Sequence, residues 1–218
     1  MFFEAESYYG LTQYQAALST YEKILQEHSN SQFIEEVKWG KALSLKALGE
    51  GEKALSLLED FQVNTSRESL KEGSLYNAIL LSMQLKKDEK TFSLIDRYMT
   101  ENSGGVHYAK VLYLRGSLFS QQGDYEKAMA DYQQYLKDFP HSDQFSEVRF
   151  LLAYNQQMAG KMDEALATYK SIQSANQKDD YHYSSLKNSI GLYIEKETPD
   201  EAYTYLKQAL EHFPDNDL

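Results

Sequence analysis

The sequence predicts an all-α fold in which six helical hairpins stack as a solenoid. Three observations predict it. The 218 residues include only 3 prolines and 11 glycines, and the abundant Ala, Leu, Glu, Lys and Gln favour helices throughout. A small residue followed four positions later by a larger one recurs every 37 residues. In each copy the apolar residues follow the three-to-four spacing of amphipathic helices.

The recurring pair gives the number of copies. In the stretch "GDYEKAMADYQQYLKDFP" (residues 123–140) it consists of Ala128 and Tyr132. The other five pairs are Ala17/Tyr21, Ala54/Leu58, Thr91/Ile95, Ala165/Tyr169 and Ala202/Leu206. From 17 to 202 is 185 residues, or five steps of 37, and so constant a register is the signature of a repeat architecture. We therefore predict one solenoid over 1–218, with repeats at about 1–31, 32–68, 69–105, 106–142, 143–179 and 180–218.

Each repeat reads as two helices around a tight turn. The first half carries a second column of mostly small residues: Ala5, Ala42, Ile79, Gly116, Ala153 and Ile190. The turn carries glycine in three copies: Gly49, Gly123 and Gly160. Helices that cross closely need small side chains beside large ones. We therefore expect Gly116 and Ala128 to be in close contact, with Tyr132 filling the space around them.

These residues resemble the tetratricopeptide repeat: a small residue in the first helix, Gly123-Asp124-Tyr125 at the turn, then Ala128, Tyr132 and Pro140. The resemblance implies a right-handed α-α superhelix whose first helices line a concave wall. Two features depart from the family. The period exceeds the usual 34, so we expect extra residues near Pro140 to lengthen the second helix or its exit loop. The third copy has Thr91 for the alanine and Lys86 for the turn glycine.

The repeats are also Tyr-rich in the style of bacterial envelope proteins of this family. That style leads us to expect a bacterial periplasm or cell envelope rather than the cytoplasm. Solenoids normally end in a polar cap, and neither end of the sequence shows one. We therefore expect an excerpt of a longer chain, in which Tyr203, Leu206 and Leu210 of the last helix are partly exposed. Self-association through the uncapped ends is one consequence to test.

Composition and spacing argue against several functions. The formal net charge of −11 with scattered lysines disfavours nucleic acid, and no apolar run is long enough for direct membrane insertion. The chain has no cysteine. Its five histidines lack metal-ligand spacing, and we expect them to lie exposed in loops. No nucleophile or paired acid stands out, so we predict no catalytic residue, no cofactor and no metal.

An aromatic stripe is the one feature that points to a binding site. The fifth place of successive repeats holds Phe2, Trp39, Tyr76, Tyr113 and Phe150, and Lys187 ends the run. In the resembled family, residues at the second, fifth, ninth, twelfth and thirteenth places of the first helix contact ligands. Carried over to this chain, these places give the candidate partner-binding residues Trp39, Leu43, Tyr76, Leu80, Met83, Tyr113, Tyr154 and Met158.

The stripe has a second interpretation, in which its rings pack against the neighbouring repeat and are mainly core. Tyrosines are the better binding candidates because a phenolic hydroxyl tolerates water, whereas Phe2 and Phe150 are expected to face the core. We predict a non-catalytic scaffold that binds a protein or peptide segment in an aromatic-lined concave groove. The alternatives are an envelope module that contacts glycan or peptidoglycan, and a regulatory domain of a larger enzyme.

Overall fold

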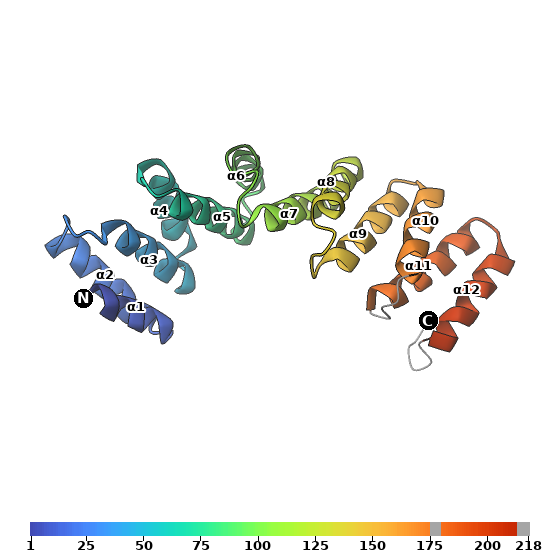
Figure 1. Ribbon diagram of the computed structural model, residues 1–218, viewed down its shortest axis with the longest axis horizontal. Helices are drawn as coiled ribbons and strands as arrows, with labels where there is room; N and C mark the ends of the chain where they lie inside the picture. The colour runs from blue at the N-terminus through green and yellow to red at the C-terminus, as the bar shows by residue number, and fades with distance from the viewer. Residues whose placement is uncertain (175–179, 213–218) are drawn as a thin grey trace. The chain divides into compact units, whose positions relative to one another are not determined.

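The computed structural model describes residues 1–174 and 180–212, and twelve α-helices run through them (Figure 1). Each odd-numbered helix is the first helix of a hairpin, and each even-numbered helix is the second. The helices are α1 (Phe2–Gly10), α2 (Tyr14–Glu27), α3 (Ile34–Ala47), α4 (Gly51–Asn64), α5 (Glu68–Gln84), α6 (Asp88–Glu101), α7 (Tyr108–Gln121), α8 (Tyr125–Asp138), α9 (Phe145–Met158), α10 (Met162–Gln173), α11 (Asp180–Glu195) and α12 (Pro199–His212). No strand occurs in the described residues. The predicted all-α class is therefore confirmed.

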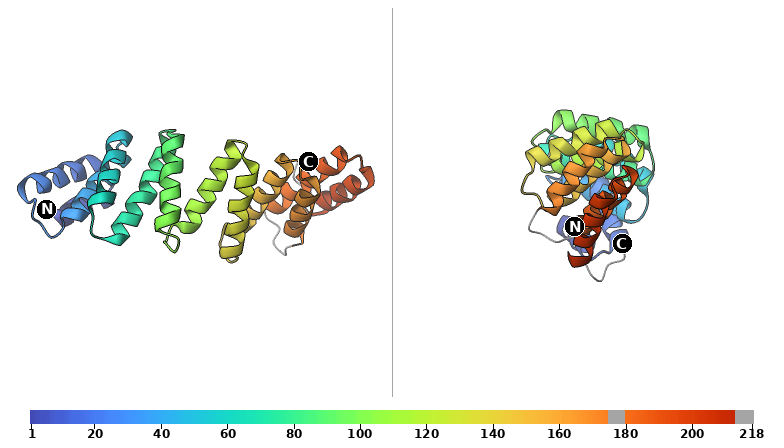
Figure 2. Two further views of the ribbon diagram at one scale, coloured as in Figure 1. Left: turned by 90° about the horizontal axis from the view of Figure 1, so that it is seen from above. Right: turned by 90° about the vertical axis from the view of Figure 1, so that its right-hand side faces the viewer.

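The chain forms two compact units, Met1–Val111 and Leu112–Leu218. In the first unit each helix from α1 to α6 packs on the helix that follows it, and α3 also contacts α1 and α5. In the second unit each helix from α8 to α12 packs on the next, and α9 also contacts α11. Figure 2 shows the hairpins following one another along each unit. The predicted hairpins are confirmed, while their union into one solenoid over 1–218 stays a prediction.

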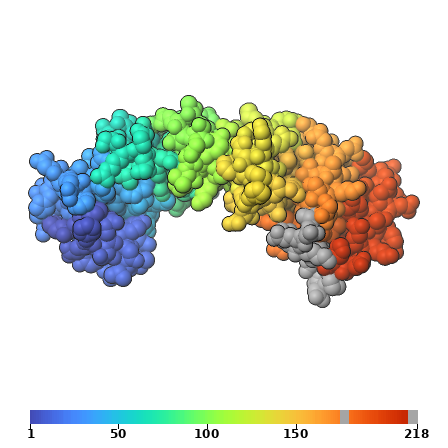
Figure 3. All heavy atoms as spheres, viewed as in Figure 1, coloured from blue at the N-terminus to red at the C-terminus, as the bar shows by residue number. Residues whose placement is uncertain are grey.

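The two predicted columns form the centre of each hairpin. The small residues of the second helices are all buried: Ala17, Ala54, Thr91, Ala128, Ala165 and Ala202. Tyr21 and Tyr132, which follow two of them, are also buried. A Cβ placed on Gly116 would lie 2.9 Å from Cε1 of Tyr132, and one placed on Gly40 would overlap the Tyr21 ring. Glycine is therefore required where these rings cross a first helix. Within each unit, atoms fill the space between successive hairpins (Figure 3).

A residue with positive φ ends the first helix of every hairpin. These residues stand 37 apart and have φ between 55° and 80°: Thr12, Gly49, Lys86, Gly123, Gly160 and Glu197. In the first hairpin the N–H of Gln13 donates to the carbonyl of Tyr8, and the N–H of Thr12 to that of Tyr9, both at 2.9 Å. This pair of bonds is the Schellman motif, which favours glycine at the left-handed residue. The sequence predicted the glycine turns but not that Thr12 and Glu197 adopt the same conformation.

The connections between hairpins differ in length. After α8 ends at Asp138, residues 139–144 lead to α9, so Pro140 lies in an exit loop as expected. Residues 65–67 join α4 to α5 more directly. This short connection is held by Glu35 of α3, which accepts hydrogen bonds from the Thr65 hydroxyl at 2.9 Å and the Ser66 N–H at 3.2 Å. These hydrogen bonds lower the pKa of the Glu35 carboxyl, and the bond from the Ser66 N–H has the largest effect.

Of the helices described, none has the length and apolar character needed to cross a bilayer.

The contact between Gly40 and Tyr21 gives a first prediction. We expect Gly40→Ala to lower the free energy of unfolding by about 1 to 3 kcal/mol, because the added methyl group overlaps a buried ring. Gly191→Ala in α11 is the matched control. A Cβ there meets nothing within 4 Å, so we expect a gain of about 0.5 to 1 kcal/mol from helix propensity. Urea unfolding measures both, and a Gly40→Ala protein as stable as the wild type would contradict the packing.

The left-handed turn residues give a second prediction. Lys86→Gly should raise the free energy of unfolding by about 1 kcal/mol, because glycine adopts positive φ without the cost paid by a residue with a Cβ. Gly49→Ala should lower it by a similar amount, since a Cβ there has free space and only the backbone conformation opposes it. Thermal and urea unfolding should agree in sign. The prediction requires that the free energy of unfolding rises for Lys86→Gly and falls for Gly49→Ala. Changes of the same sign would show that the backbone conformation of the turn does not determine the effect.

Candidate functional site

Five of the predicted site residues lie together in the first unit. Trp39 and Leu43 belong to α3, and Tyr76, Leu80 and Met83 belong to α5; we call these five the first-unit patch. The two helices contact each other, and all five side chains are half-buried. The patch therefore consists of half-buried apolar side chains on two first helices that contact each other.

A polar bond ties the two helices beside the patch. The Nζ of Lys46, on α3, donates to Oδ1 of Asn77, on α5, at 2.8 Å. Burial lowers the pKa of the Lys46 ammonium. This lysine stands one turn from Leu43, so the patch includes a partly desolvated cation at its edge.

The aromatic rings of the first unit pack against neighbouring residues. Trp39 lies against Gly73 of α5, where a Cβ would be 3.3 Å from its ring. Tyr76 stacks on His107, with centroids 4.0 Å apart and planes 14° from parallel. Phe2 stacks on Phe33 at 4.7 Å. The second interpretation of the stripe, packing against the next repeat, therefore accounts for much of the area of these rings.

The Tyr76–His107 stack is held by a hydrogen-bonded group. The hydroxyl of Tyr98 donates to Oε1 of Glu72 at 2.5 Å, and the backbone N–H of His107 donates to the same oxygen at 3.2 Å. Burial lowers the pKa of the His107 imidazole and raises that of the Tyr98 phenol. The His107 imidazole thus lies over the Tyr76 ring, in the connection that leads to α7.

The remaining predicted residues lie in the second unit: Tyr113 on α7, with Tyr154 and Met158 on α9. We call Tyr154 and Met158 the second-unit patch; their side chains are 39% and 45% exposed. Tyr113 instead forms a hydrogen bond within the protein: its hydroxyl donates to Oε1 of Glu147 at 2.8 Å. Burial, and secondly that hydrogen bond, raise the pKa of Tyr113 to about 12.

One exposed apolar residue was missed by the sequence reasoning. Ile194 of α11 is exposed, and α11 contacts α9, which carries the second-unit patch. Ile194 stands 37 residues after Gln157 and 111, or three times 37, after Met83. The register alone would have placed it at the same site, but the aromatic stripe ends at Lys187 of this repeat, so its first helix was left out of the predicted site.

The expectation that all five histidines lie exposed in loops is wrong. His28 and His141 are exposed, but His182 is buried within α11 and its ring packs edge-on against His212 at 5.8 Å. The reason is that α11 begins at Asp180, so His182 stands in a first turn and not in a connection. Within residues 1–174 and 180–212, no group of three or more His, Asp or Glu side chains is arranged to hold a metal ion.

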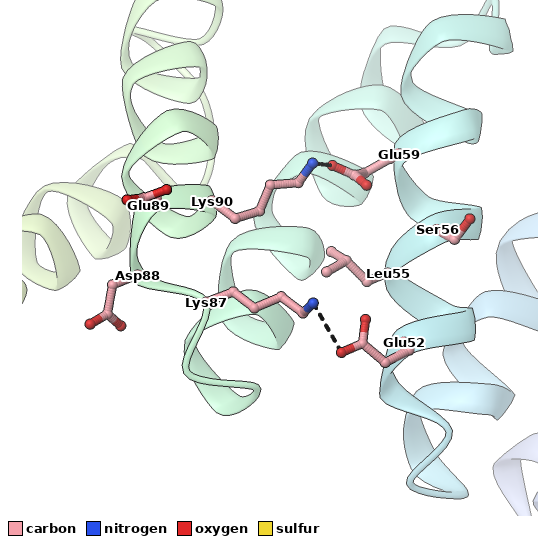
Figure 4. A pocket seen from close by; sticks show the side chains of 8 residues that line it. All are labelled: Glu52, Leu55, Ser56, Glu59, Lys87, Asp88, Glu89 and Lys90. Atoms are coloured by element: carbon pink, nitrogen blue, oxygen red, sulfur yellow. Dashed lines mark ion pairs between the residues drawn. The ribbon is translucent and has the colours of Figure 1, made fainter.

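Hollows occur away from the predicted groove. One of about 500 Å³ lies between α4 and α6, the second helices of adjacent hairpins. Lys87 and Lys90 reach across it to Glu52 and Glu59, with Leu55 between the two pairs (Figure 4). The Lys87–Glu52 pair measures 3.0 Å. Both lysines are thus paired within the hollow, and the two charged residues of its lining that remain, Asp88 and Glu89, are acidic.

Comparison with known proteins identifies the family. Two family models described as tetratricopeptide repeat match the chain, one over residues 119–190 and the other over residues 4–31. The chain therefore carries tetratricopeptide repeats (TPRs). No curated protein matches it.

Solved TPR structures share the fold. A TPR protein from Parabacteroides merdae is 16% identical, with a TM-score of 0.67 over 96% of this chain and 77% of its own. The C-terminal part of a TPR repeat-containing protein from Cytophaga hutchinsonii is 13% identical, with a TM-score of 0.74 over 97% and 79%. YrrB, described as a TPR protein with an unusual peptide-binding site, is 18% identical, with a TM-score of 0.63 over 90% and 93%. TPR folds are typical of protein–protein interaction scaffolds and are typically non-catalytic.

The packed tyrosines of the TPR hairpins give a third prediction, about alkaline pH. The pKa of Tyr113 in the folded protein, about 12, lies above the ordinary phenol value of 10.0. The stabilisation from the neutral phenol is thus complete below pH 10 and is lost as the pH rises through 12. We expect Tyr113→Phe to flatten the loss of stability between these pH values, measured as urea midpoints at pH 7, 10.5 and 11.5. Tyr154→Phe, at an exposed ring, is the control, and equal pH dependence in wild type and Tyr113→Phe would refute the assignment.

Proposed function

We propose that the protein is a non-catalytic scaffold that binds a protein segment on the wall formed by its first helices. The observation that carries this proposal is the second-unit patch, where Tyr154 and Met158 are 39% and 45% exposed on a first helix. Large apolar side chains exposed side by side on a rigid element are what a partner's side chains cover at an interface. Ile194, exposed on the adjoining α11, extends the same surface.

The first-unit patch supports a weaker or more polar contact. Its rings already pack on Gly73 and His107, so a partner gains only their remaining exposed area. The half-buried Lys46 at its edge favours a partner group that carries an oxygen acceptor, because a desolvated ammonium is stabilised by such a group. Both patches are preorganised, since each lies on helices fixed by hairpin packing, and this limits the entropy lost on binding.

The Tyr-rich repeats support a location in a bacterial envelope. The exposure of Phe3 and Tyr203, on the first and last helices, supports self-association through the ends.

The fourth prediction tests the wall. Peptides selected from a random displayed library against the immobilised chain should lose about tenfold in affinity, or 1.4 kcal/mol, on a Tyr154→Ser plus Met158→Ser variant. Fluorescence anisotropy with labelled peptides measures the dissociation constants. Both side chains are partly exposed, so circular dichroism should show an unchanged fold.

The control places the same change on a second helix. Val63 of α4 is exposed, and Val63→Ser should leave the affinity unchanged within about twofold. If the selected peptides bind the wall variant as tightly as the wild type, the groove is not the site. If Trp39→Ala also binds the peptides as tightly as the wild type and only Val63→Ser loses affinity, the binding site lies on the second helices.

A further inference from the structure

The polar groups of the first-unit patch are hydrogen-bond donors that lack acceptors. In the part of the chain that the structure describes, neither the indole N–H of Trp39 nor the hydroxyl of Tyr76 forms a hydrogen bond. Both side chains are half-buried and keep part of their surface open to solvent. Lys46, beside the patch, uses one of its three ammonium N–H groups on Oδ1 of Asn77. The patch therefore offers donors to a ligand.

The carboxylates nearest to these donors are already occupied. Glu36 stands three residues before Trp39 on α3 and forms an ion pair with Arg67. Its second oxygen, Oε2, is buried. On α5, Oε1 of Glu72 accepts from the Tyr98 hydroxyl at 2.5 Å. A ligand that brings N–H groups to the patch thus meets carboxylates that the protein's own donors already use.

This imbalance favours one kind of peptide. An ordinary residue carries one N–H and one carbonyl, and an N–H placed against an aromatic ring loses its water without gaining an acceptor. Proline keeps the carbonyl but has no N–H. In the polyproline II helix the carbonyls also form no internal hydrogen bonds. A proline-rich segment therefore supplies acceptors to Trp39 and Tyr76 without leaving its own donors unpaired.

The spacing of the two rings fits the same ligand. Trp39 and Tyr76 hold the same place in consecutive repeats, on the contacting helices α3 and α5, and helices in contact lie about 8 to 10 Å apart. Polyproline II has three residues per turn and rises about 3.1 Å per residue, so residues i and i+3 share a face and lie about 9 Å apart. A segment that crosses the two helices can thus place one proline on each ring.

We propose that the first-unit patch binds a proline-rich segment in the polyproline II conformation, with prolines at i and i+3 on the rings of Trp39 and Tyr76. The indole N–H and the Tyr76 hydroxyl donate to carbonyls of the segment. The inference rests on the proposed function and names the partner of one of its two patches. The rings are held against Gly73 and His107, and the segment is stiff, so little entropy is lost on binding although the open area is small.

The experiment titrates the isotopically labelled full chain with synthetic peptides. Trp39 is the only tryptophan of the sequence, so its indole N–H gives one identifiable nuclear magnetic resonance signal. The probe is a peptide of alanines with prolines at i and i+3. The control peptides have prolines at i and i+2, or no proline. We expect the probe to shift the indole signal to saturation, and both controls to bind at least about fivefold more weakly.

Protein variants test the hydroxyl and the place of the site. Tyr76→Phe keeps the ring but removes the hydroxyl, and it should weaken probe binding by about threefold to tenfold. Tyr14→Phe makes the same change on the second helix α2 and should leave the affinity unchanged within about twofold. Tyr154→Ser plus Met158→Ser should also leave it unchanged, because that patch belongs to the other unit.

Three results would overturn the inference: an indole signal that does not move at about 1 mM probe, equal binding of the probe and its proline-free control, or a Tyr76→Phe chain that binds the probe as tightly as the wild type. The peptides selected from the displayed library separate this failure from failure of the proposed function. If they bind the second-unit patch while the proline probe does not bind, the inference is wrong and the proposed function stands. If neither binds, the proposed function fails as well.

Discussion

The tyrosine at the centre of the second helix packs between two first helices at once. In the first hairpin, the Tyr21 hydroxyl donates to Glu6 of its own first helix, and the ring lies against Gly40 of the next one. In the fifth, the Tyr169 hydroxyl donates to Gln157 of α9 at 3.2 Å and accepts from Asn188 of α11 at 2.8 Å. A side chain in this position sets the separation of successive first helices. The wall they form, and any site on it, depends on that separation.

The columns could be predicted because they follow from this constraint. A ring between two helices requires small residues around it, and the sequence repeats them at a constant interval: Ala128 is buried, and Gly116 meets the Tyr132 ring as expected. Whether the rings of the aromatic stripe are packed or exposed could not be predicted from the sequence. Its packing depends on connections that the period does not specify, since the residue that covers Tyr76 is His107, in the connection before α7. The burial of His182 was missed for a related reason, because the sequence placed it in the loop before the helix, whereas it lies in the first turn of α11.

The two patches show how one repeat yields different surfaces. Tyr76 and Tyr113 stand 37 residues apart, yet Tyr76 stacks on an imidazole and Tyr113 donates to a carboxylate. His107 and Glu147 each hold the ring in place and reduce the area of the tyrosine that a ligand could contact. Tyr76 and Tyr113 are therefore mainly packing residues of the wall. Tyr154 stands four places further along the repeat than a fifth-place ring and retains a large exposed area. Burying apolar area yields roughly 25 cal/mol per Å², so exposed residues of this kind supply most of the gain on binding. Affinity should therefore be concentrated where the rings are not already packed.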